Sequence, residues 1–354
     1  MNPVHYSDYL QLEKILQAQE LESDKRDAHA HDEMLFIVIH QAYELWFKQL
    51  LFEVESVASI LKKPSLNDNS PELQTIVHRL SRSVTILKLL VQQIDVMETM
   101  TPMDFLDFRD MLRPASGFQS WQFKILEARL GLKFEHRHGQ EYYISQLRPA
   151  QVEMIKNAEQ EKTILELING WLERMPFFSQ ADNWEGFDSA QESGISFGKS
   201  VGEKKFWNQY FHLYKKSLAE AEQSQYSSFI EVFSEETSGK SATAFSPAAN
   251  RAALFIMLYR GYPMLQLPFQ VLNVLLEIDE QLSTWRYRHM SMVHRIIGSR
   301  IGTGGSTGKE YLKGAIDKHH IFASIARLTS FLIERRHLPA LSKEMESRLG
   351  FVNH

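Results

Sequence analysis

Two pairs of aromatic and polar residues are spaced one helical turn apart, which puts both side chains of each pair on one face of a helix. Phe36 and His40 form the first pair, and Phe105 and Arg109 form the second. A neutral imidazole in an apolar setting accepts a hydrogen bond from an N–H group. A guanidinium beside an apolar wall suits a carboxylate, which it binds through two parallel hydrogen bonds.

Spacing alone leaves a simpler interpretation open for each pair. His40 has the pattern of a buried core histidine that is hydrogen-bonded for structural reasons. Arg109 has three acidic neighbours that compete for its guanidinium, Asp104, Asp107 and Asp110.

A third candidate is His289, which shares a helical face with bulky apolar residues, Trp285, Met292 and Val293. An axial haem ligand needs this kind of setting, with a rigid helix, apolar walls and cations that meet the haem propionates. Arg286 and Arg288 are the candidates for those cations. The alternative is an ordinary core histidine, and zinc is not favoured because no cluster with zinc-ligand spacing occurs.

A glycine-rich stretch, GTGGSTG at 302–308, follows the predicted helix that carries His289. Its residue order is not that of a phosphate-binding loop, and no strand precedes it. It reads either as a linker after a helix end or as a lid whose hydroxyls and carbonyls close over a polar ligand group. The density of glycine in a chain with only 17 glycines favours the lid.

Composition excludes several classes of chemistry. The 354 residues include no cysteine, which excludes disulfides, thiolate-ligated haem, iron–sulfur clusters and cysteine nucleophiles. The net charge of −5 gives no reason to expect a nucleic acid or an anionic membrane as partner. The N-terminus lacks the pattern of a secretory signal, and no apolar run approaches the ~20 residues of a membrane span, so we expect a cytoplasmic protein.

Apolar residues recur with the helical period along most of the chain, and no run shows the alternation of a strand. A capping residue followed by proline, at Ser70-Pro71 and Thr101-Pro102, predicts two helix starts. The predicted helices cover about 32–62, 70–100, 101–113, 116–131, 149–174, 250–261 and 269–300. Prolines and glycines predict an irregular connection over 175–200 and a break at Pro263 and Pro268, and the Ser/Thr-rich stretch 224–246 is predicted to be the most mobile.

These patterns predict an all-α fold. We expect the main helical core to comprise residues 31–148 and 246–354, with residues 149–245 as a smaller helical insertion and residues 1–30 as a separate N-terminal segment.

Three long motifs, in this order along the chain, resemble the tryptophan 2,3-dioxygenase family. They are HDEMLFIVIHQAYELWFKQ at 31–49, DFRDMLRPASGFQSWQF at 107–123 and WRYRHMSMVHRIIGSRIGTGGSTG at 285–308. The opening segment YSDYLQLEKILQAQEL at 6–21 also fits, so the similarity extends through most of the chain. It is weakest at about 225–246, and no role is transferred to that stretch.

The resemblance implies roles for individual residues. The stretch from Phe36 through Ile37, Val38 and Ile39 to His40 is similar to the segment that contacts the substrate indole, with Phe36 on the ring and His40 facing the indole N–H. Phe105 matches an aromatic pocket position. Arg109 resembles the arginine that holds the substrate carboxylate, and the remaining substrate-binding positions are Ser116 and Thr303.

The resemblance also implies a cofactor, a reaction and an assembly. His289 looks like the axial ligand of a haem b iron, and ferrous haem would use O2 to open the indole ring of L-tryptophan and form N-formyl-L-kynurenine, the first step of tryptophan degradation by the kynurenine pathway. Tyr6 and Tyr9 resemble tyrosines that reach a neighbouring subunit's site, which implies a helix-swapped N-terminal segment in a homotetramer, a dimer of dimers. Two alternatives stay open: a different haem-dependent oxidation of a tryptophan derivative, and a non-catalytic haem sensor or scaffold.

Overall fold

The computed structural model describes residues 3–66, 70–137, 144–175, 178, 181–184, 195–235, 243–298, 300, 314 and 319–350. Helices are the only regular secondary structure in these residues, with no strand among them, which confirms the all-α class. No helix in this part of the chain combines the length and apolar character needed to cross a membrane.

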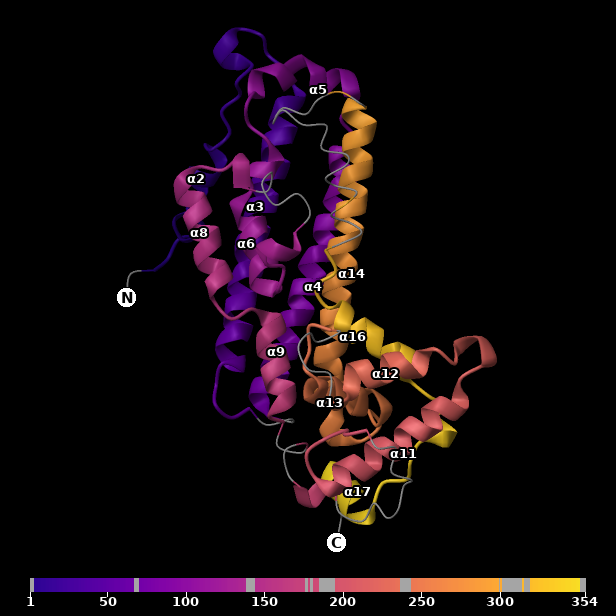
Figure 1. Cartoon of the computed structure of the whole chain (residues 1–354). Helices are drawn as coiled ribbons and strands as arrows, with labels where there is room; N and C mark the ends of the chain where they lie inside the picture. Colours follow the sequence, from indigo (N-terminus) through magenta and orange to yellow (C-terminus); the bar gives the residue numbers. More distant parts are fainter. Residues whose placement is uncertain are drawn as a thin grey trace.

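Three long helices form an elongated bundle (Figure 1): α3 (Asp32–Leu61), α4 (Pro71–Met97) and α14 (Pro263–Ile297). Helix α4 packs against both of the others. The core between them consists of fully buried aliphatic side chains, among them Val57, Leu80 and Leu275. Burying such side chains is the main stabilising contribution to a bundle of this kind.

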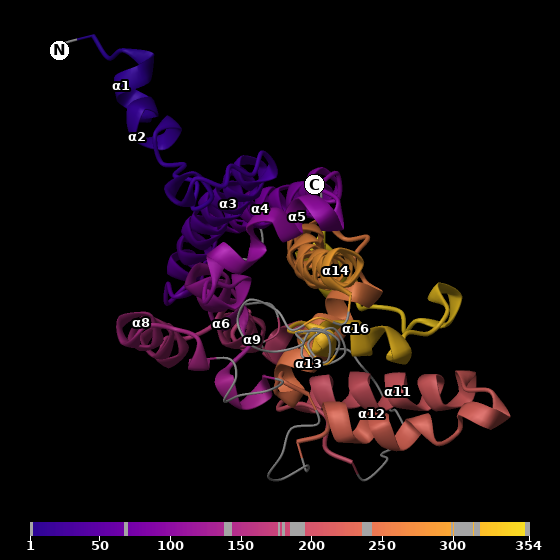
Figure 2. The same ribbon diagram turned by 90° about the horizontal axis from the view of Figure 1, so that it is seen from above.

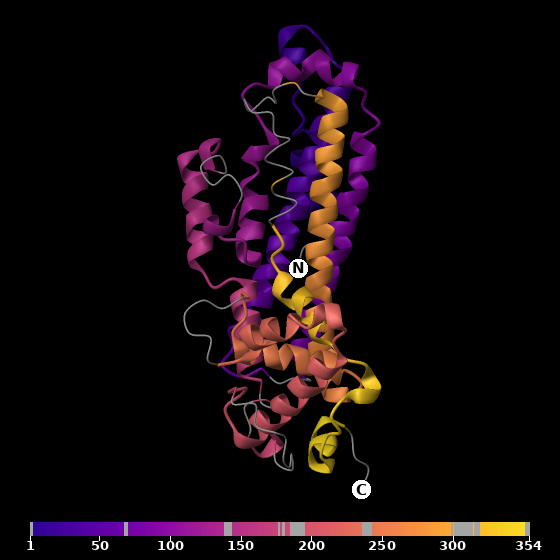
Figure 3. The same cartoon turned by 45° about the vertical axis from the view of Figure 1, so that its right-hand side comes forward.

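Three shorter helices cover one side of the bundle. Helices α6 (Trp121–Leu130) and α9 (Ile164–Glu173) pack on α3, and α8 (Pro149–Gln160) packs on α6 and stands away from the long helices (Figure 3). The chain turns out of α6 at Gly131, whose φ of 147° favours glycine.

A second group of helices surrounds the lower end of α14 (Figure 1): α11 (Val201–Ser217), α12 (Gln225–Phe233), α13 (Pro247–Leu258), α16 (Ala323–Leu328) and α17 (Lys343–Leu349). Its interior is rich in aromatic rings, with Phe229 and Phe233 at 4.4 Å between centroids. Buried residues of the long-helix bundle and of this second group form one continuous apolar core. Short 3-10 turns complete the described structure at Asp24–Arg26, Asp110–Leu112, Gly117–Gln119, Phe134–His136, Ala181–Trp184, Glu220–Glu222, Thr329–Phe331 and Arg335–His337.

The N-terminal arm, α1 (Tyr6–Leu10) and α2 (Leu12–Leu16), projects away from the rest of the chain (Figure 2). The two helices join at Gln11, which has a φ of 51°. None of their residues is buried, although the arm carries several apolar side chains.

Local capping signals set several helix boundaries as predicted. Ser70 Oγ accepts a hydrogen bond from the Leu73 N–H at 3.2 Å, and Pro71 occupies the first helical position of α4. Thr101 starts α5 (Pro102–Arg109) in the same way, and its N–H donates to the Asp104 carboxylate at 2.8 Å. Helix α5 lies across the upper end of the bundle, in contact with α3 and α14 (Figure 1).

Three predictions of helix extent, and part of one prediction of a mobile stretch, were wrong. The predicted helix over 149–174 is two helices, because Thr163 caps a new start and Glu166 completes the capping box. The predicted box at Ser116 exists but starts only a 3-10 turn, and Ser120 caps α6. Helix α14 begins at Pro263 and continues through Pro268, near its N-terminal end. Part of the stretch predicted to be mobile is α12, which buries Phe229, Val232 and Phe233.

Candidate active site

An apolar cluster, here called the upper cluster, lies where α3, α5 and α14 meet at the upper end of the bundle. Its buried members come from all three helices and include Ile39, Phe105, Phe108 and Met292. Half-buried Phe36 and Trp285 pack against them. Residues from three separate sequence motifs therefore form one apolar environment.

Phe36 is at the centre of the aromatic contacts in this cluster. Its ring centroid lies 5.7 Å from that of Phe105 and 5.6 Å from that of Phe108, and the ring of His40 is 4.1 Å away. Phe105 and Phe108 meet edge to face at 5.4 Å. Contacts at these distances hold aromatic rings in defined orientations, so the cluster offers a fixed wall for a flat apolar ligand.

His40 is held by its own helix. Its Nδ1 lies 2.7 Å from the carbonyl oxygen of Phe36. A carbonyl oxygen only accepts hydrogen bonds, so Nδ1 carries the proton and Nε2 keeps a lone pair. Burial lowers the pKa of His40 below its ordinary 6.5. Near neutral pH the side chain is therefore an uncharged imidazole that can accept a hydrogen bond.

His289 lies on α14, stacked on Trp285 with 5.1 Å between ring centroids and 6° between ring planes. Its Nδ1 is buried and has no hydrogen-bond partner among the described residues. Burial, and secondarily the charge that His40 would carry, lower the pKa of His289 to about 4. His289 is thus a neutral imidazole with a free lone pair, as a metal ligand must be, and it is close enough to His40 for their charges to interact.

Arg109 ends α5 and is buried, with 5% of its surface exposed. Two of the three acidic residues near it in the sequence have partners of their own: Asp104 caps α5, and Asp110 pairs with Arg113 at 3.2 Å. Arg109 follows Phe105 by one turn on the helix that walls the upper cluster. A buried guanidinium beside aromatic rings suits a carboxylate on an apolar ligand.

The other predicted site residues lie in several places. Ile39 is buried in the upper cluster, Ile37 is half-buried, and Val38 is 46% exposed. Half-buried Ser116 caps a 3-10 turn by accepting a hydrogen bond from the Phe118 N–H at 3.3 Å. Tyr6 and Tyr9 are exposed on the N-terminal arm. Thr303 and the glycine-rich loop at 302–308 lie outside the described residues.

The two arginines suggested for haem propionates are already paired. Arg286 is buried and donates to Glu127 at 2.7 Å and to the His319 carbonyl at 3.0 Å. Arg288 donates to Asp95 at 2.6 Å and to Glu98 at 3.3 Å. Both arginines were suggested because they are close to His289 in sequence. Closeness in sequence does not show which carboxylates from other helices pair with them.

Sequence reasoning missed Phe108 and Glu127. Phe108 is fully buried between Phe36 and Phe105, and the aromatic run around Phe105 was the signal for it. Glu127 is buried between Arg137, at 2.6 Å, and Arg286. Burial raises the pKa of Glu127, but the two guanidinium groups outweigh it and hold the pKa at about 2. No local pattern marks this pair, because Arg286 is far from Glu127 in sequence.

Comparison with known proteins identifies the family of the chain. A family model described as tryptophan 2,3-dioxygenase matches residues 1–332. A tryptophan 2,3-dioxygenase of Bdellovibrio bacteriovorus is 43% identical over 99% of this chain and 98% of its own length. Proteins of the same name from Dictyostelium discoideum and Rattus norvegicus are 40% and 38% identical, over 99% and 95% of this chain and 88% and 84% of their own lengths.

The matched region contains the upper cluster, both of its histidines and Arg109. The family model and the full-length relatives lead to the same assignment: the chain belongs to the tryptophan 2,3-dioxygenase family.

Proposed function

We propose that this chain is a haem-dependent dioxygenase that opens the indole ring of L-tryptophan and forms N-formyl-L-kynurenine. Both atoms of O2 enter the product and the indole C2–C3 bond breaks, so the reaction consumes no other oxidant or reductant. The observation that carries the proposal is the position of two neutral imidazoles, His40 and His289, at one apolar cluster. The shared name of the relatives supports tryptophan as the substrate.

The residues present fit a haem b group. His289 has a buried ring nitrogen without a hydrogen-bond partner among the described residues, a depressed pKa, and the stacked ring of Trp285 beside it. His289 would hold the haem iron, and ferrous haem, when bound, would supply the activation of O2. The protein's own tasks are to position the substrate and to exclude water.

We assign the substrate contacts to the side chains of the upper cluster. Phe36, Phe105 and Phe108 would pack on the indole ring, and Nε2 of His40 would accept a hydrogen bond from the indole N–H. His40 then orients the ring and does not act as a strong base, because an indole N–H is a very weak acid. Arg109 would hold the carboxylate. Ile37, Val38, Ile39, Ser116 and Thr303 keep the substrate-binding roles that the family resemblance implies.

We further propose that the chain works as a homotetramer, a dimer of dimers, in the cytoplasm. The N-terminal arm supports an assembly, because Tyr6 is 70% exposed, Tyr9 74% and Leu16 71%. Apolar side chains that are exposed together are usually covered by a partner. In a helix-swapped assembly Tyr6 and Tyr9 would reach the site of a neighbouring subunit.

The decisive experiment is an optical spectrum of the haem-reconstituted, reduced protein, followed by addition of L-tryptophan and air. We expect a Soret band and a growing near-ultraviolet absorbance of N-formylkynurenine that requires both tryptophan and O2. In His289→Ala the Soret band of bound haem and the turnover should be lost, whereas His294→Ala, an exposed histidine on the same helix, should keep both.

The same experiment separates the competing functions. A normal Soret band without consumption of tryptophan would indicate a haem sensor. A hydroxylated product in place of N-formylkynurenine would indicate a different oxidation in the same pocket. A His289→Ala protein with ordinary haem content and rate would contradict the axial assignment.

A further inference from the structure

We propose that a pocket at the lower end of α14 binds a small aromatic carboxylate. This pocket, here called the lower pocket, has a volume of about 460 Å³. It lies between the turn that joins α13 to α14 and the 3-10 turn Arg335–His337. Its volume is within the range of about 300–1,000 Å³ that is usual for small-molecule sites.

The lower pocket is separate from the upper cluster. Phe269 lines it near the start of α14, and His289 follows twenty residues later on the same helix. At 1.5 Å per helical residue, that separation is about 30 Å. The proposal therefore does not depend on the proposed dioxygenase function.

Aromatic side chains form much of the pocket wall, and hydrogen bonds fix two of them. Tyr259 donates to the carbonyl of Pro339 at 2.7 Å, which ties the end of α13 to the segment after the 3-10 turn. Tyr262 donates to the Glu346 carboxylate at 2.8 Å, which ties the start of α14 to α17. A wall that is already ordered lowers the entropic cost of binding a flat ligand.

Two guanidinium groups line the same pocket, those of Arg260 and Arg335. Arg260 lies over the ring of Phe269, with 4.8 Å from its Cζ to the ring centroid. Neither arginine has a carboxylate within 4.0 Å in the described part of the chain. The acidic residue next to Arg335 in sequence, Glu334, pairs instead with Arg336 at 2.6 Å.

The charge of this site is unusual for the molecule. The whole chain has a net charge of −5, yet no acidic residue lines the lower pocket. Two positive groups beside an aromatic wall attract an anion with an apolar body, and guanidinium groups match the geometry of a carboxylate. An aromatic monocarboxylate supplies both features in one small molecule.

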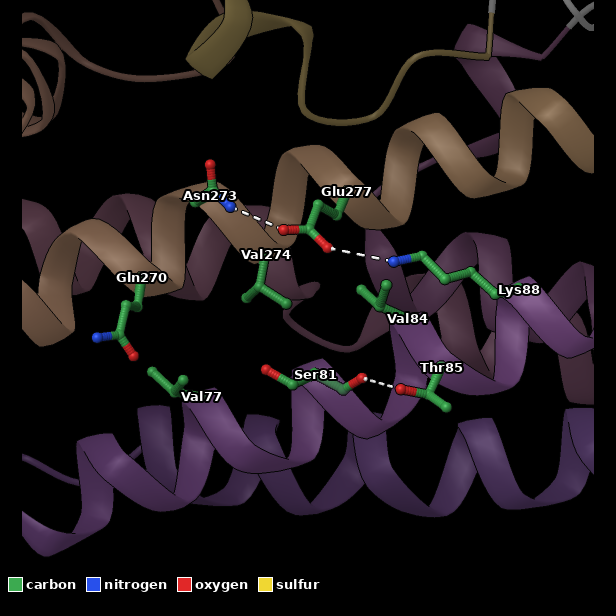
Figure 4. A pocket seen from close by; sticks show the side chains of 9 residues that line it. All are labelled: Val77, Ser81, Val84, Thr85, Lys88, Gln270, Asn273, Val274 and Glu277. Carbon is green, nitrogen blue, oxygen red and sulfur yellow. Dashed lines mark hydrogen bonds and ion pairs between the residues drawn. The ribbon is translucent and has the colours of Figure 1, made fainter.

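A second groove, on the outside of the α4–α14 pair, provides a contrast (Figure 4). Its volume is about 300 Å³, and its one cationic side chain, Lys88, faces a carboxylate of the same lining. Lys88 lies 3.9 Å from the Glu277 carboxylate, which also accepts a hydrogen bond from Asn273 at 2.8 Å. Because Glu277 neutralises Lys88, this groove lacks the net positive charge that the two arginines give the lower pocket.

Binding of phenylacetate to the full-length protein, measured by calorimetry, tests the proposal. We expect phenylacetate to bind and the neutral isostere phenylacetamide to bind at least about tenfold more weakly, because it lacks the charge-assisted hydrogen bonds. Arg260→Gln and Arg335→Gln should each lower the affinity for phenylacetate by about tenfold. Arg148→Gln, which removes an equal charge at an exposed site before α8, should leave the affinity unchanged.

A variant of the upper cluster locates the bound probe. Arg109→Gln should keep phenylacetate binding if the probe occupies the lower pocket. Loss of binding in Arg109→Gln with retention in Arg335→Gln would place the probe in the upper cluster and overturn the proposal. Equal affinity for phenylacetate and phenylacetamide, or no binding of either, would also overturn it. The measurement needs neither haem nor turnover, so its failure is distinct from failure of the proposed function.

Discussion

The imidazole of His289 lies nearly parallel to the indole of Trp285, with 6° between the ring planes and 5.1 Å between the centroids. The two residues are one turn apart on α14, and Trp285 is itself fixed by Phe123, at 4.9 Å between centroids. Trp285 therefore holds the ring of His289 in one orientation. The role proposed for His289 as a haem ligand makes this contact important, because a metal-ligating histidine is usually oriented by a hydrogen bond to its other ring nitrogen, and Nδ1 of His289 has no such partner among the described residues.

Replacing Trp285 with leucine should weaken haem binding, because the stacked contact that orients His289 is removed. A ring contact of this kind is worth about 0.5–1.5 kcal/mol, so we expect haem affinity to fall about two- to tenfold. Haem titration followed at the Soret band measures the change. Trp285→Phe should keep most of the affinity, and Tyr287→Phe, at an exposed position of α14, should have no effect. Equal affinity in Trp285→Leu and wild type would show that the stacking does not orient the ligand.

The sequence made the local parts of the site predictable and left the contacts between helices unknown. The Phe36–His40 and Phe105–Arg109 pairs follow from helical spacing, and the Ser70 cap follows from residue type. The pairing of Glu127 with Arg286 depends on how α6 packs on the rest of the fold, which no local pattern encodes. The break between α8 and α9 was missed although it has a local signal, because residues 159–163 are all polar and Thr163 and Glu166 have the spacing of a capping box.

Replacing His40 with alanine should lower kcat/KM for tryptophan by about tenfold, because a hydrogen bond to the indole N–H is worth about 0.5–1.5 kcal/mol. The diagnostic comparison uses 1-methyltryptophan, which has no indole N–H. Wild type and His40→Ala should turn over that substrate at similar rates. A full tenfold loss with the methylated substrate would mean that His40 acts in another way.

Replacing Arg109 with alanine should mainly raise KM, because the charge-assisted hydrogen bonds that we propose it makes to the substrate carboxylate are lost. Their worth of about 1.5–3 kcal/mol corresponds to a loss of about 10- to 200-fold in kcat/KM. Steady-state kinetics measures it, with Arg113→Ala as the control, since Arg113 is exposed and pairs with Asp110. Binding of tryptamine, which lacks the carboxylate, should not distinguish Arg109→Ala from wild type.

Acid should destabilise the haem-free protein through His289. The pKa of His289 is about 4 in the folded state against 6.5 for an ordinary histidine, so the unfolded state binds more protons between these values. The contribution of His289 to the free energy of unfolding is fully present above about pH 6.5. It decreases as the pH falls to 4, by up to about 3 kcal/mol. Denaturant unfolding across this range should show a shallower fall for His289→Gln. Parallel curves for the two proteins would contradict the depressed pKa.

Replacing Glu127 with glutamine should strongly destabilise the fold. Glu127 is the buried carboxylate between Arg137 and Arg286, and its removal takes the nearest negative charge from two buried guanidinium groups, although Glu159 stays 4.0 Å from Arg137. Such a loss typically costs about 3–5 kcal/mol in the free energy of unfolding, which denaturant titration measures. Glu231→Gln, which removes an exposed carboxylate 3.5 Å from Arg327, should cost less than about 1 kcal/mol.

The effect of Glu127→Gln should depend on pH. Because the pKa of Glu127 is about 2, its contribution is present above pH 4.5 and is lost as the pH falls through 2, so wild type and Glu127→Gln should converge in stability at low pH. A constant difference down to pH 2 would contradict an ionised Glu127 as the source of the stabilisation.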